Sequence, residues 1–425
     1  MGFELDTQSF WDNSQLEAEL KRVFDICSGC RRCYHLCPSF TDLFARLDKD
    51  SVDGEAEKLA AEDLRSVTDL CYQCKLCFNH CPYTPPHRWQ VDFPRMMLRS
   101  KALQVKREGQ SLQDRFLGRT DLIGRIGSYL APLANWANRN FHSRRLMEKL
   151  LGIHQERLLP PYASETFRYW FLQRTMNHGS EVGKRVVLFY TCSVNFNEPE
   201  VGQACVKVLE RNGIRVTCPE QRCCGMPFLD GGDMDATKNS ARANVESLQA
   251  WVKEGYDIVV PGPTCSYMLK YEYPMLLKGD SVKKVAARTF DICEYLMALH
   301  REGRLDTRFV KEMGAVTYQM PCHLRAQNIG YKTRDLLELL PRARVHLVEK
   351  CAAIDGTWGL KRQYYDLSMK VAEPLLRELR DSGSDWTVSD CPMARLQIEQ
   401  GMGKKPLHPV QLLQMAYGPD QESKR

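Results

Sequence analysis

The stretch 27-CSGCRRCYHLCP-38 decides the fold of the first part of the chain. Its four cysteines are separated by two, two and three residues, and a proline follows the fourth. The same arrangement returns at 71-CYQCKLCFNHCP-82. Thiols that only pack a core have no reason to recur at a fixed spacing, so the two stretches predict paired sites that bind a metal or a cofactor.

Three cysteines at this spacing can surround one iron–sulfur cluster, whereas the fourth ligates the other cluster in the two-cluster ferredoxin pattern. We therefore expect two [4Fe–4S] clusters. The first would be held by Cys27, Cys30, Cys33 and Cys81. The second would be held by Cys71, Cys74, Cys77 and Cys37. Pro38 and Pro82 lack an N–H and are predicted to stop the local helix. Structural zinc is the alternative, but it needs two C-x2-C pairs rather than two quartets that end in proline.

The composition indicates a globular protein that keeps its thiols reduced. The chain has 425 residues, 43% apolar and 26% charged, with 18 cysteines and a formal net charge of +6. The N-terminal stretch MGFELDTQSFWDNSQ lacks the basic and apolar pattern of a secretory signal, and no apolar run approaches the roughly 20 residues of a membrane span. We therefore expect a cytoplasmic protein of two or three domains, whose cysteines serve metal or redox chemistry rather than disulfides.

The residues around the quartets predict helices. The stretch 13-NSQLEAELKRVFDI-26 places Leu16, Leu20 and Phe24 on one face, with Asn13 or Ser14 as the N-cap. The stretch 54-GEAEKLAAEDLRSVTDL-70 is also helical in pattern. With its two quartets and this helical spacer, the segment 1–98 resembles the α-helical ferredoxin domains of heterodisulfide reductase and succinate dehydrogenase iron–sulfur subunits.

The segment 99–182 is a basic connector without cysteine. Between Arg95 and Leu150 there are twelve Lys and Arg residues against four Asp and Glu residues. The stretch 120–140 is amphipathic, and its apolar positions are Leu122, Ile126, Tyr129, Leu133 and Trp136. We favour packing of this apolar face against the rest of the chain. The alternative is a helix that lies on an anionic membrane or on a membrane partner. No nucleic-acid-binding signature accompanies the charge.

The last 240 residues contain an internal repeat. Short apolar runs precede Cys192, Cys322, Cys351 and Cys391, and each run is followed by a stretch with helical pattern. Corresponding positions are about 130 residues apart: 322 − 192 = 130, 351 − 223 = 128 and 391 − 262 = 129. Strands that alternate with helices predict two α/β units, with the cysteines just past the strand ends, where α/β sheets place ligands.

The two units, 183–298 and 299–425, resemble the cysteine-rich CCG domain of heterodisulfide reductases. The same domain occurs in an iron–sulfur subunit of anaerobic glycerol-3-phosphate dehydrogenase, in glycolate oxidase iron–sulfur subunits and in lactate-utilisation proteins. In that family a full unit has the pattern C…CCG…CxxC. The first unit keeps Cys192, Cys223, Cys224 and Cys265, with Gly262 in place of one cysteine. The second keeps Cys322, Cys351 and Cys391, with Ala352, Ala353 and Ala394 at the other positions.

Four thiolates suffice for one cluster, so we expect a further iron–sulfur cluster in the first unit. The second unit could hold a cluster, a structural zinc ion, or nothing if it only packs. His323 and Asp355 are candidates for a ligand that completes its three thiols. Cys205, Cys218 and Cys293 match no motif position and are expected to be buried apolar residues.

Taken together, the sequence predicts an α+β multidomain protein: an α-helical ferredoxin domain with two cluster sites, then a duplicated α/β CCG domain. No flavin or NAD signature is visible. The resemblance implies an electron-transfer subunit that works between a flavoprotein, or another redox subunit, and a quinone or other acceptor. It also implies a location in the cytoplasm or on the inner face of the membrane. A disulfide reductase and an electron donor to a peroxide-reducing iron protein are the alternatives.

Overall fold

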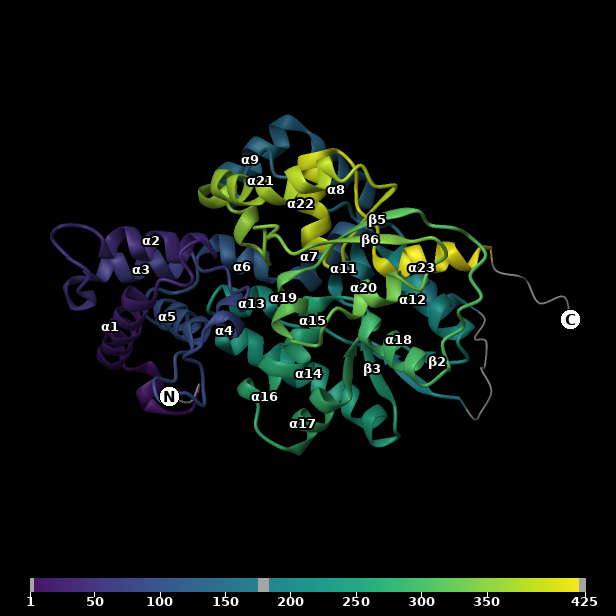
Figure 1. Cartoon of the computed structure of the whole chain (residues 1–425), viewed down its shortest axis with the longest axis horizontal. Coiled ribbons are helices and arrows are strands. Elements are labelled where there is room, and N and C mark those ends of the chain that lie inside the picture. The colour runs from purple at the N-terminus through teal and green to yellow at the C-terminus, as the bar shows by residue number, and fades with distance from the viewer. Residues whose placement is uncertain (1–3, 175–182, 420–425) are drawn as a thin grey trace, which may run out of the picture.

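The computed structural model describes residues 4–174 and 183–419. A helical part forms one end of the molecule, and the two repeats form the other (Figure 1). The last residues of the predicted connector, 175–182, lie outside the described residues.

The N-terminal part is helical, as predicted. Its helices are α1 (Asn13–Cys30), α2 (Pro38–Leu47), α3 (Ala61–Asp69), α4 (Leu76–His80) and α5 (Phe93–Glu108). Helix α1 buries Leu16, Leu20 and Phe24 on one face, in agreement with the pattern.

Three details of this part differ from the prediction. The N-cap of α1 is Asp12, whose side chain accepts from the Gln15 N–H. The helix predicted from Gly54 begins only at Ala61, because Gly54 has a left-handed backbone (φ 76°) and turns with one short 3-10 helix, Ala56–Lys58, follow it. Pro38 does not stop a helix but begins α2, where its missing N–H costs nothing.

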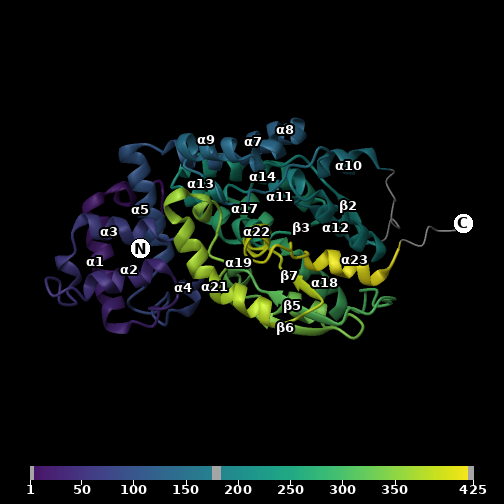
Figure 2. The ribbon, with the colours of Figure 1, turned by 90° about the horizontal axis from the view of Figure 1, so that it is seen from above.

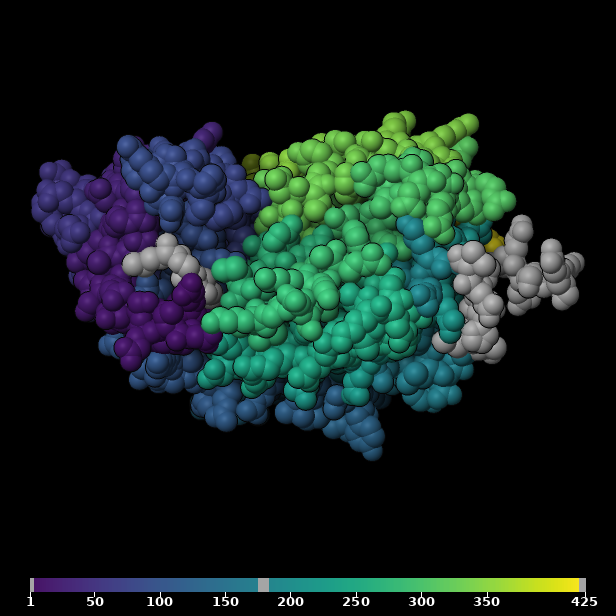
Figure 3. Space-filling model, turned by 90° about the horizontal axis from the view of Figure 1, so that it is seen from below, coloured from purple at the N-terminus to yellow at the C-terminus, as the bar shows by residue number. Residues whose placement is uncertain are grey.

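The connector forms a row of short helices along one long edge of the molecule (Figure 2). They are α6 (Leu112–Gly118), α7 (Thr120–Tyr129), α8 (Ala131–Arg139), α9 (Phe141–Leu151) and α10 (Phe167–Gln173). The same helices protrude along the lower edge of the space-filling view (Figure 3).

The prediction that the apolar face of α7 and α8 packs inward is wrong. Its five apolar positions are 50–88% exposed. Small residues face inward instead: a Cβ on Gly124 would collide with the Phe196 ring, and one on Gly127 would meet the Tyr162 ring at 2.6 Å. Close packing of these glycines turns the large apolar side chains outward.

Each repeat contains a parallel sheet. The first has strands β1 (Arg185–Leu188), β2 (Arg215–Thr217), β3 (Asp257–Val260) and β4 (Thr289–Asp291) in the order β2-β1-β3-β4. The second has β5 (Ala315–Gln319), β6 (Arg344–Val348) and β7 (Trp386–Val388) in the order β6-β5-β7. In both sheets the first strand of the repeat lies between the second and the third, which confirms the internal duplication.

Helices and turns surround both sheets. The helices of the first repeat are α11 (Cys192–Phe196), α12 (Pro199–Arg211), α13 (Met226–Asp230), α14 (Met234–Lys253), α15 (Pro263–Tyr267), the π-helix η3 (Met268–Glu272), α16 (Tyr273–Leu276), α17 (Asp280–Ala287) and α18 (Ile292–Arg301). Those of the second are α19 (Cys322–Ala326), α20 (Lys332–Leu337), α21 (Tyr365–Asp381), α22 (Pro392–Met402) and α23 (Pro409–Tyr417). One buried core contains residues of both repeats, among them Val186 of β1 and Val316 of β5. The two repeats therefore form one packed body.

Candidate iron–sulfur sites

The first predicted thiol set is brought together by the fold. Cys27 and Cys30 lie on the last turn of α1, Cys33 follows it, and Cys81 follows α4. Burial raises the pKa of Cys27, and the neighbouring Cys33, Cys81 and Cys30 raise it further. The four side chains line one small cavity. Thiolates that converge in this way repel one another, and iron removes that repulsion, so the donor set fits a cluster.

The second set lies beside the first and deeper in the molecule. Burial raises the pKa of Cys77, and Cys74, Cys71, Cys37 and Cys33 add to the shift in that order. Cys77 therefore lies near its own set and near the first set as well. Cys37 is the N-cap of α2, and burial followed by the nearby Cys71 raises its pKa to about 12.

The four thiols of the first repeat meet past the carboxyl ends of its strands. Cys192 Sγ lies 3.9 Å from Cys223 Sγ. This contact raises the pKa of Cys192 and lowers that of Cys223. Hydrogen bonds to Cys223 and, to a smaller extent, to Cys265 raise the pKa of Cys224. The Cys223 N–H donates to Asp121 of α7 at 2.8 Å, which ties the connector to this set.

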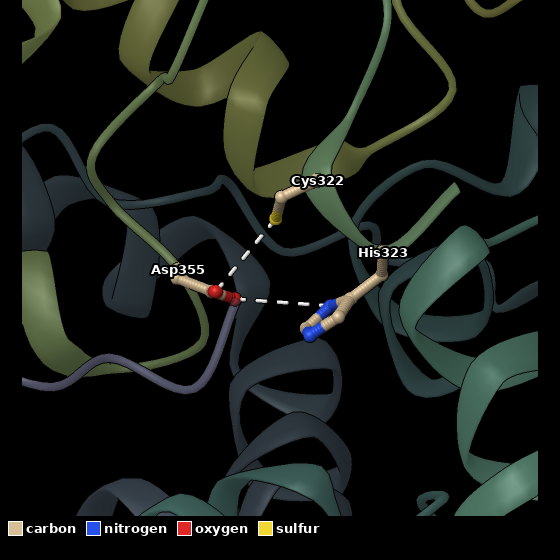
Figure 4. A group of neighbouring side chains, drawn as sticks. All are labelled: Cys322, His323 and Asp355. Carbon is tan, nitrogen blue, oxygen red and sulfur yellow. Dashed lines mark hydrogen bonds and ion pairs between the residues drawn. The ribbon is translucent and has the colours of Figure 1, made fainter. Parts of the chain in front are cut away.

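The three thiols of the second repeat also converge. Burial raises the pKa of Cys322, with further contributions from Asp355, Cys74, Cys351 and Cys391. Asp355 Oδ2 lies 3.7 Å from Cys322 Sγ, and the two side chains point toward each other (Figure 4). Three sulfur atoms and one carboxylate oxygen thus share one site.

His323, the other candidate ligand, already uses both ring nitrogens. Nε2 lies 3.1 Å from the carbonyl oxygen of Gln73, so it carries the proton and donates. Nδ1 then accepts from the Thr264 hydroxyl at 2.9 Å. Burial lowers the pKa of His323, which keeps the imidazole neutral. His323 therefore joins the ferredoxin loop to both repeats, and Asp355 is better placed as a ligand.

The four sets follow one another in space. Cys77 of the second set lies near Cys33 of the first. Cys74 of the second set lies near Cys351 and Asp355 of the second repeat. Tyr72, between Cys71 and Cys74, has its hydroxyl 3.4 Å from Cys351 Sγ. Cys391 lines a small cavity with Cys322 and Cys351, and it also lines a larger cavity with all four thiols of the first repeat. The thiols of the second repeat thus lie between those of the ferredoxin part and those of the first repeat, while the first repeat also contacts the ferredoxin part directly through Glu272.

A buried polar chain supports the second set. Gln73 Nε2 donates to Cys71 Sγ at 3.4 Å, while Gln73 Oε1 accepts from Lys75 Nζ at 2.6 Å. Lys75 is only 4% exposed and pairs with Glu272 of η3 at 3.3 Å. Burial would raise the pKa of Glu272, but Lys75 and Arg95 hold it at about 2. Gln73 and Lys75 both have left-handed backbones, φ 56° and 65°.

The sequence analysis did not predict this buried chain of polar contacts. Its only signal is Lys75, a charged residue inside a cysteine quartet. Arg31 holds the equivalent place in the first quartet and has the same left-handed backbone, yet it pairs with Asp48 at the surface. Glu272 is almost 200 residues away and carries no signal. Cys205, Cys218 and Cys293 are buried, as expected.

Known protein families match most of this architecture. A Citrate utilization protein B Fer4-like domain matches residues 20–107, and a Cysteine-rich domain matches twice, at 186–270 and 316–399. One subunit of the anaerobic glycerol-3-phosphate dehydrogenase of Escherichia coli K12 is 31% identical over 310 residues, which is 72% of this chain and 77% of the relative. The chain belongs to the CCG family of iron–sulfur subunits.

Two further CCG-family relatives match a smaller share of this chain. One subunit of the fumarate reductase (CoM/CoB) of Methanothermobacter marburgensis is 29% identical over 57% of this chain and 48% of its own length. Lactate utilization protein A of Geobacillus kaustophilus is 29% identical over 49% of this chain and 87% of its own length. As a CCG-family member, the chain carries iron–sulfur clusters and is an electron-transfer subunit of an oxidoreductase. The predicted fold class, a helical ferredoxin domain before a duplicated CCG domain, is confirmed.

Proposed function

We propose that the chain relays electrons through four cluster sites in the order first quartet set, second quartet set, second repeat, first repeat. The observation that supports this proposal is the spatial succession of the thiol sets through Cys33 and Cys77, Cys74 and Cys351, and Cys391. Iron–sulfur clusters accept and pass on one electron at a time, and the protein sets their spacing and potentials.

The first quartet set is the end that receives a redox partner subunit. Its thiols are half-buried, and the side chains of Arg32 and His35 beside it are exposed. The second set includes the buried Cys71 and Cys77. Relatives are named as subunits of a dehydrogenase and of a reductase, which supports the presence of a second polypeptide. We propose that this polypeptide is a flavoprotein and that it binds at this end.

In the second repeat we propose that Asp355 supplies the fourth ligand beside Cys322, Cys351 and Cys391. A carboxylate oxygen is an accepted iron ligand, although harder than a thiolate. The Asp355 side chain is 6% exposed and faces the Cys322 sulfur, and burial raises its pKa to about 7, so a bound iron would favour its ionised form in this position.

Metal content tests the number of occupied sites. Protein purified without oxygen should contain about sixteen iron atoms and as many sulfides, which corresponds to four [4Fe–4S] clusters. About twelve irons, or about twelve with one zinc, would contradict the cluster in the second repeat. Low-temperature EPR of the reduced protein counts the clusters independently.

Replacing Asp355 and His323 one at a time tests which of the two residues is the fourth ligand. Asp355→Ala should lose iron from the second repeat, whereas His323→Gln should keep it, because His323 acts through hydrogen bonds. Asp355→Cys should restore about four irons per chain and change the EPR signal of that site. Unchanged iron in Asp355→Ala would show that another group completes the site.

The exposed apolar face of the connector is proposed to bind an anionic lipid surface. We define this docking surface by its exposed apolar residues: Leu122, Ile126, Tyr129, Leu130, Leu133, Trp136, Phe141, Leu146 and Leu150. The same helices carry exposed Arg119, Arg125, Arg139, Arg145 and Lys149, whereas Asp121 and Glu148 are half-buried. None of the described helices is long and apolar enough to cross a bilayer. Basic and large apolar side chains together suit the interface of an anionic membrane.

Vesicle binding tests the docking surface. The variant Tyr129→Asp with Trp136→Asp should bind phosphatidylglycerol vesicles at least about tenfold more weakly, because each buried aromatic side chain contributes about 1.5–3 kcal/mol. Val310→Asp, which removes another exposed apolar residue outside the connector, is the matched control and should bind as the wild type does. Binding should weaken at high salt. Equal binding of all three proteins would point to a protein that covers this face instead.

A further inference from the structure

The side chain of Tyr72 extends from the ferredoxin loop into the second repeat. Tyr72 lies between Cys71 and Cys74 of the second quartet set in the sequence. Its hydroxyl nevertheless lies 3.4 Å from the Sγ atom of Cys351, a thiol of the second repeat. Tyr72 is only 3% exposed, so the contact is shielded from water. The residue therefore belongs to one thiol set by its backbone and contacts the next set with its side chain.

The Tyr72 hydroxyl is the donor in this contact when Cys351 binds iron. A metal-bound cysteine is a thiolate and has no proton to give. A tyrosine hydroxyl has a pKa of about 10 in water and keeps its proton at neutral pH. The N–H of Ala353 donates to the same sulfur atom at 3.2 Å. Cys351 thus has one donor from its own loop and one from the ferredoxin part.

Aromatic packing holds the Tyr72 ring in this position. Its centroid lies 5.0 Å from that of Trp358, which is 4% exposed and stacks in turn on Tyr364 at 4.7 Å. The indole N–H of Trp358 donates at 3.2 Å to the carbonyl oxygen of Asp69, at the end of α3. These contacts join the ferredoxin part to the second repeat around the Tyr72 ring, so the hydroxyl is held on the sulfur atom.

The first quartet has a different residue at the equivalent position. Ser28 follows the first cysteine there, where the second quartet has Tyr72. The Ser28 hydroxyl donates to the carbonyl oxygen of Gly54 at 3.2 Å, within the ferredoxin part. Of the two quartets, the one with the tyrosine is the one whose thiols lie beside the second repeat. The aromatic side chain therefore occurs at the junction between two thiol sets.

We propose that the Tyr72 hydroxyl raises the reduction potential of the second-repeat site through its hydrogen bond to Cys351. The inference rests on the proposed cluster in that repeat and names a positioning residue that regulates it. Hydrogen bonds to sulfur are one means by which a protein sets a cluster's potential, and a donor stabilises the reduced state because its charge is more negative. The hydroxyl keeps its proton throughout, and only the electron changes place. The contact therefore favours the electron on the second-repeat side of the junction.

Tyr72→Phe removes the donor and leaves the ring. The variant, purified without oxygen, should keep the iron content of the wild type. Its second-repeat site should be harder to reduce by about tenfold in the one-electron equilibrium, which is a fall of about 59 mV. EPR-monitored redox titration measures this shift, and the signal of the site is the one that changes in Asp355→Cys. The potentials of the quartet clusters should change much less.

Tyr364→Phe is the matched control, because it removes a hydroxyl from the same group of stacked rings. Among the described residues, no hydrogen bond joins the Tyr364 hydroxyl to a sulfur atom, so all potentials should stay as in the wild type. A second replacement should shift the potential the other way. With 3-fluorotyrosine at position 72, the hydroxyl is a stronger donor and the second-repeat potential should rise above that of the wild type.

Three results would overturn the inference: an unchanged second-repeat potential in Tyr72→Phe, an equal fall in Tyr364→Phe, or a potential that 3-fluorotyrosine does not raise. Loss of second-repeat iron in Tyr72→Phe would also overturn it, since Tyr72 would then support the structure of the site rather than its potential. Wild-type protein without iron in the second repeat would overturn the proposed cluster together with the inference. The iron content of the wild type therefore distinguishes the two failures.

Discussion

Replacing Lys75 with methionine should destabilise the protein by about 3 kcal/mol, because it removes one of the two cations that pair with the buried Glu272 carboxylate and leaves only Arg95. The same change should lower the reduction potential of the second quartet cluster. Without the ammonium group, the Gln73 amide loses the contact that keeps its Nε2 directed at Cys71 Sγ. Hydrogen bonds to cluster sulfur tune the potential, and N–H donors favour the reduced form, whose charge is more negative. We expect a fall on the order of 60 mV, a tenfold change in a one-electron equilibrium.

Two further variants separate the two effects. Arg31→Met changes the equivalent residue of the first quartet, whose partner Asp48 is at the surface, and should leave stability nearly unchanged. Lys75→Met combined with Glu272→Leu removes both charges of the Lys75–Glu272 pair, while Arg95 keeps Asp92 as a partner, and should recover most of the stability. It should not recover the potential, because the contact to Gln73 is still absent. Denaturant unfolding and EPR-monitored redox titration measure the two quantities. A potential that returns together with the stability would contradict the role of Gln73.

Replacing Cys351 with serine should stop electron flow between the ferredoxin part and the first repeat. Cys351 belongs to the proposed site between their thiols and lies beside Tyr72 and Cys74. The variant should lose about four of the sixteen expected irons and keep the EPR signals of the quartet clusters. Rapid-freeze EPR after reduction through the quartet end should then show these clusters reduced while the first-repeat signal stays oxidised.

Cys205→Ala is the matched control for this experiment. Cys205 is fully buried in the core of the first repeat and belongs to none of the four sets. It should lose some stability, as a core truncation does, but no iron and no electron flow. If the first-repeat cluster is still reduced at the normal rate in Cys351→Ser, the second repeat is not part of the relay.

Much of the architecture could be predicted from local patterns in the sequence. The duplication follows from equal offsets between cysteines, and the strand positions follow from apolar runs that end at Cys192, Cys322 and Cys391. These signals are readable because each lies within one element or repeats at a fixed distance. The fold brings each predicted thiol set together, which makes the ligand assignments stronger proposals.

The largest errors concern contacts between distant segments. The large apolar side chains of α7 face outward because Gly124 packs on the Phe196 ring. The sequence of α7 alone predicts an apolar stripe, but it does not show which part of the protein packs against that stripe. The N-cap of α1 moved by one residue, which lies within the usual uncertainty of helix ends. The Lys75–Glu272 pair joins residues 197 positions apart (272 − 75 = 197), and no local pattern contains it.

The proposed relay accounts for the cysteine losses of the second repeat by the position of its thiols. Its remaining thiols are enclosed between Tyr72 of the ferredoxin loop on one side and the cavity wall on the other. The complete CCG triplet, Cys223 to Gly225, belongs to the copy that opens on the cavity. In the proposed relay the second repeat only passes electrons between two neighbouring sites, so it needs no more ligands than one cluster requires. On that proposal the two copies came to differ in role after the duplication: the second conducts, and the first exchanges electrons with the acceptor.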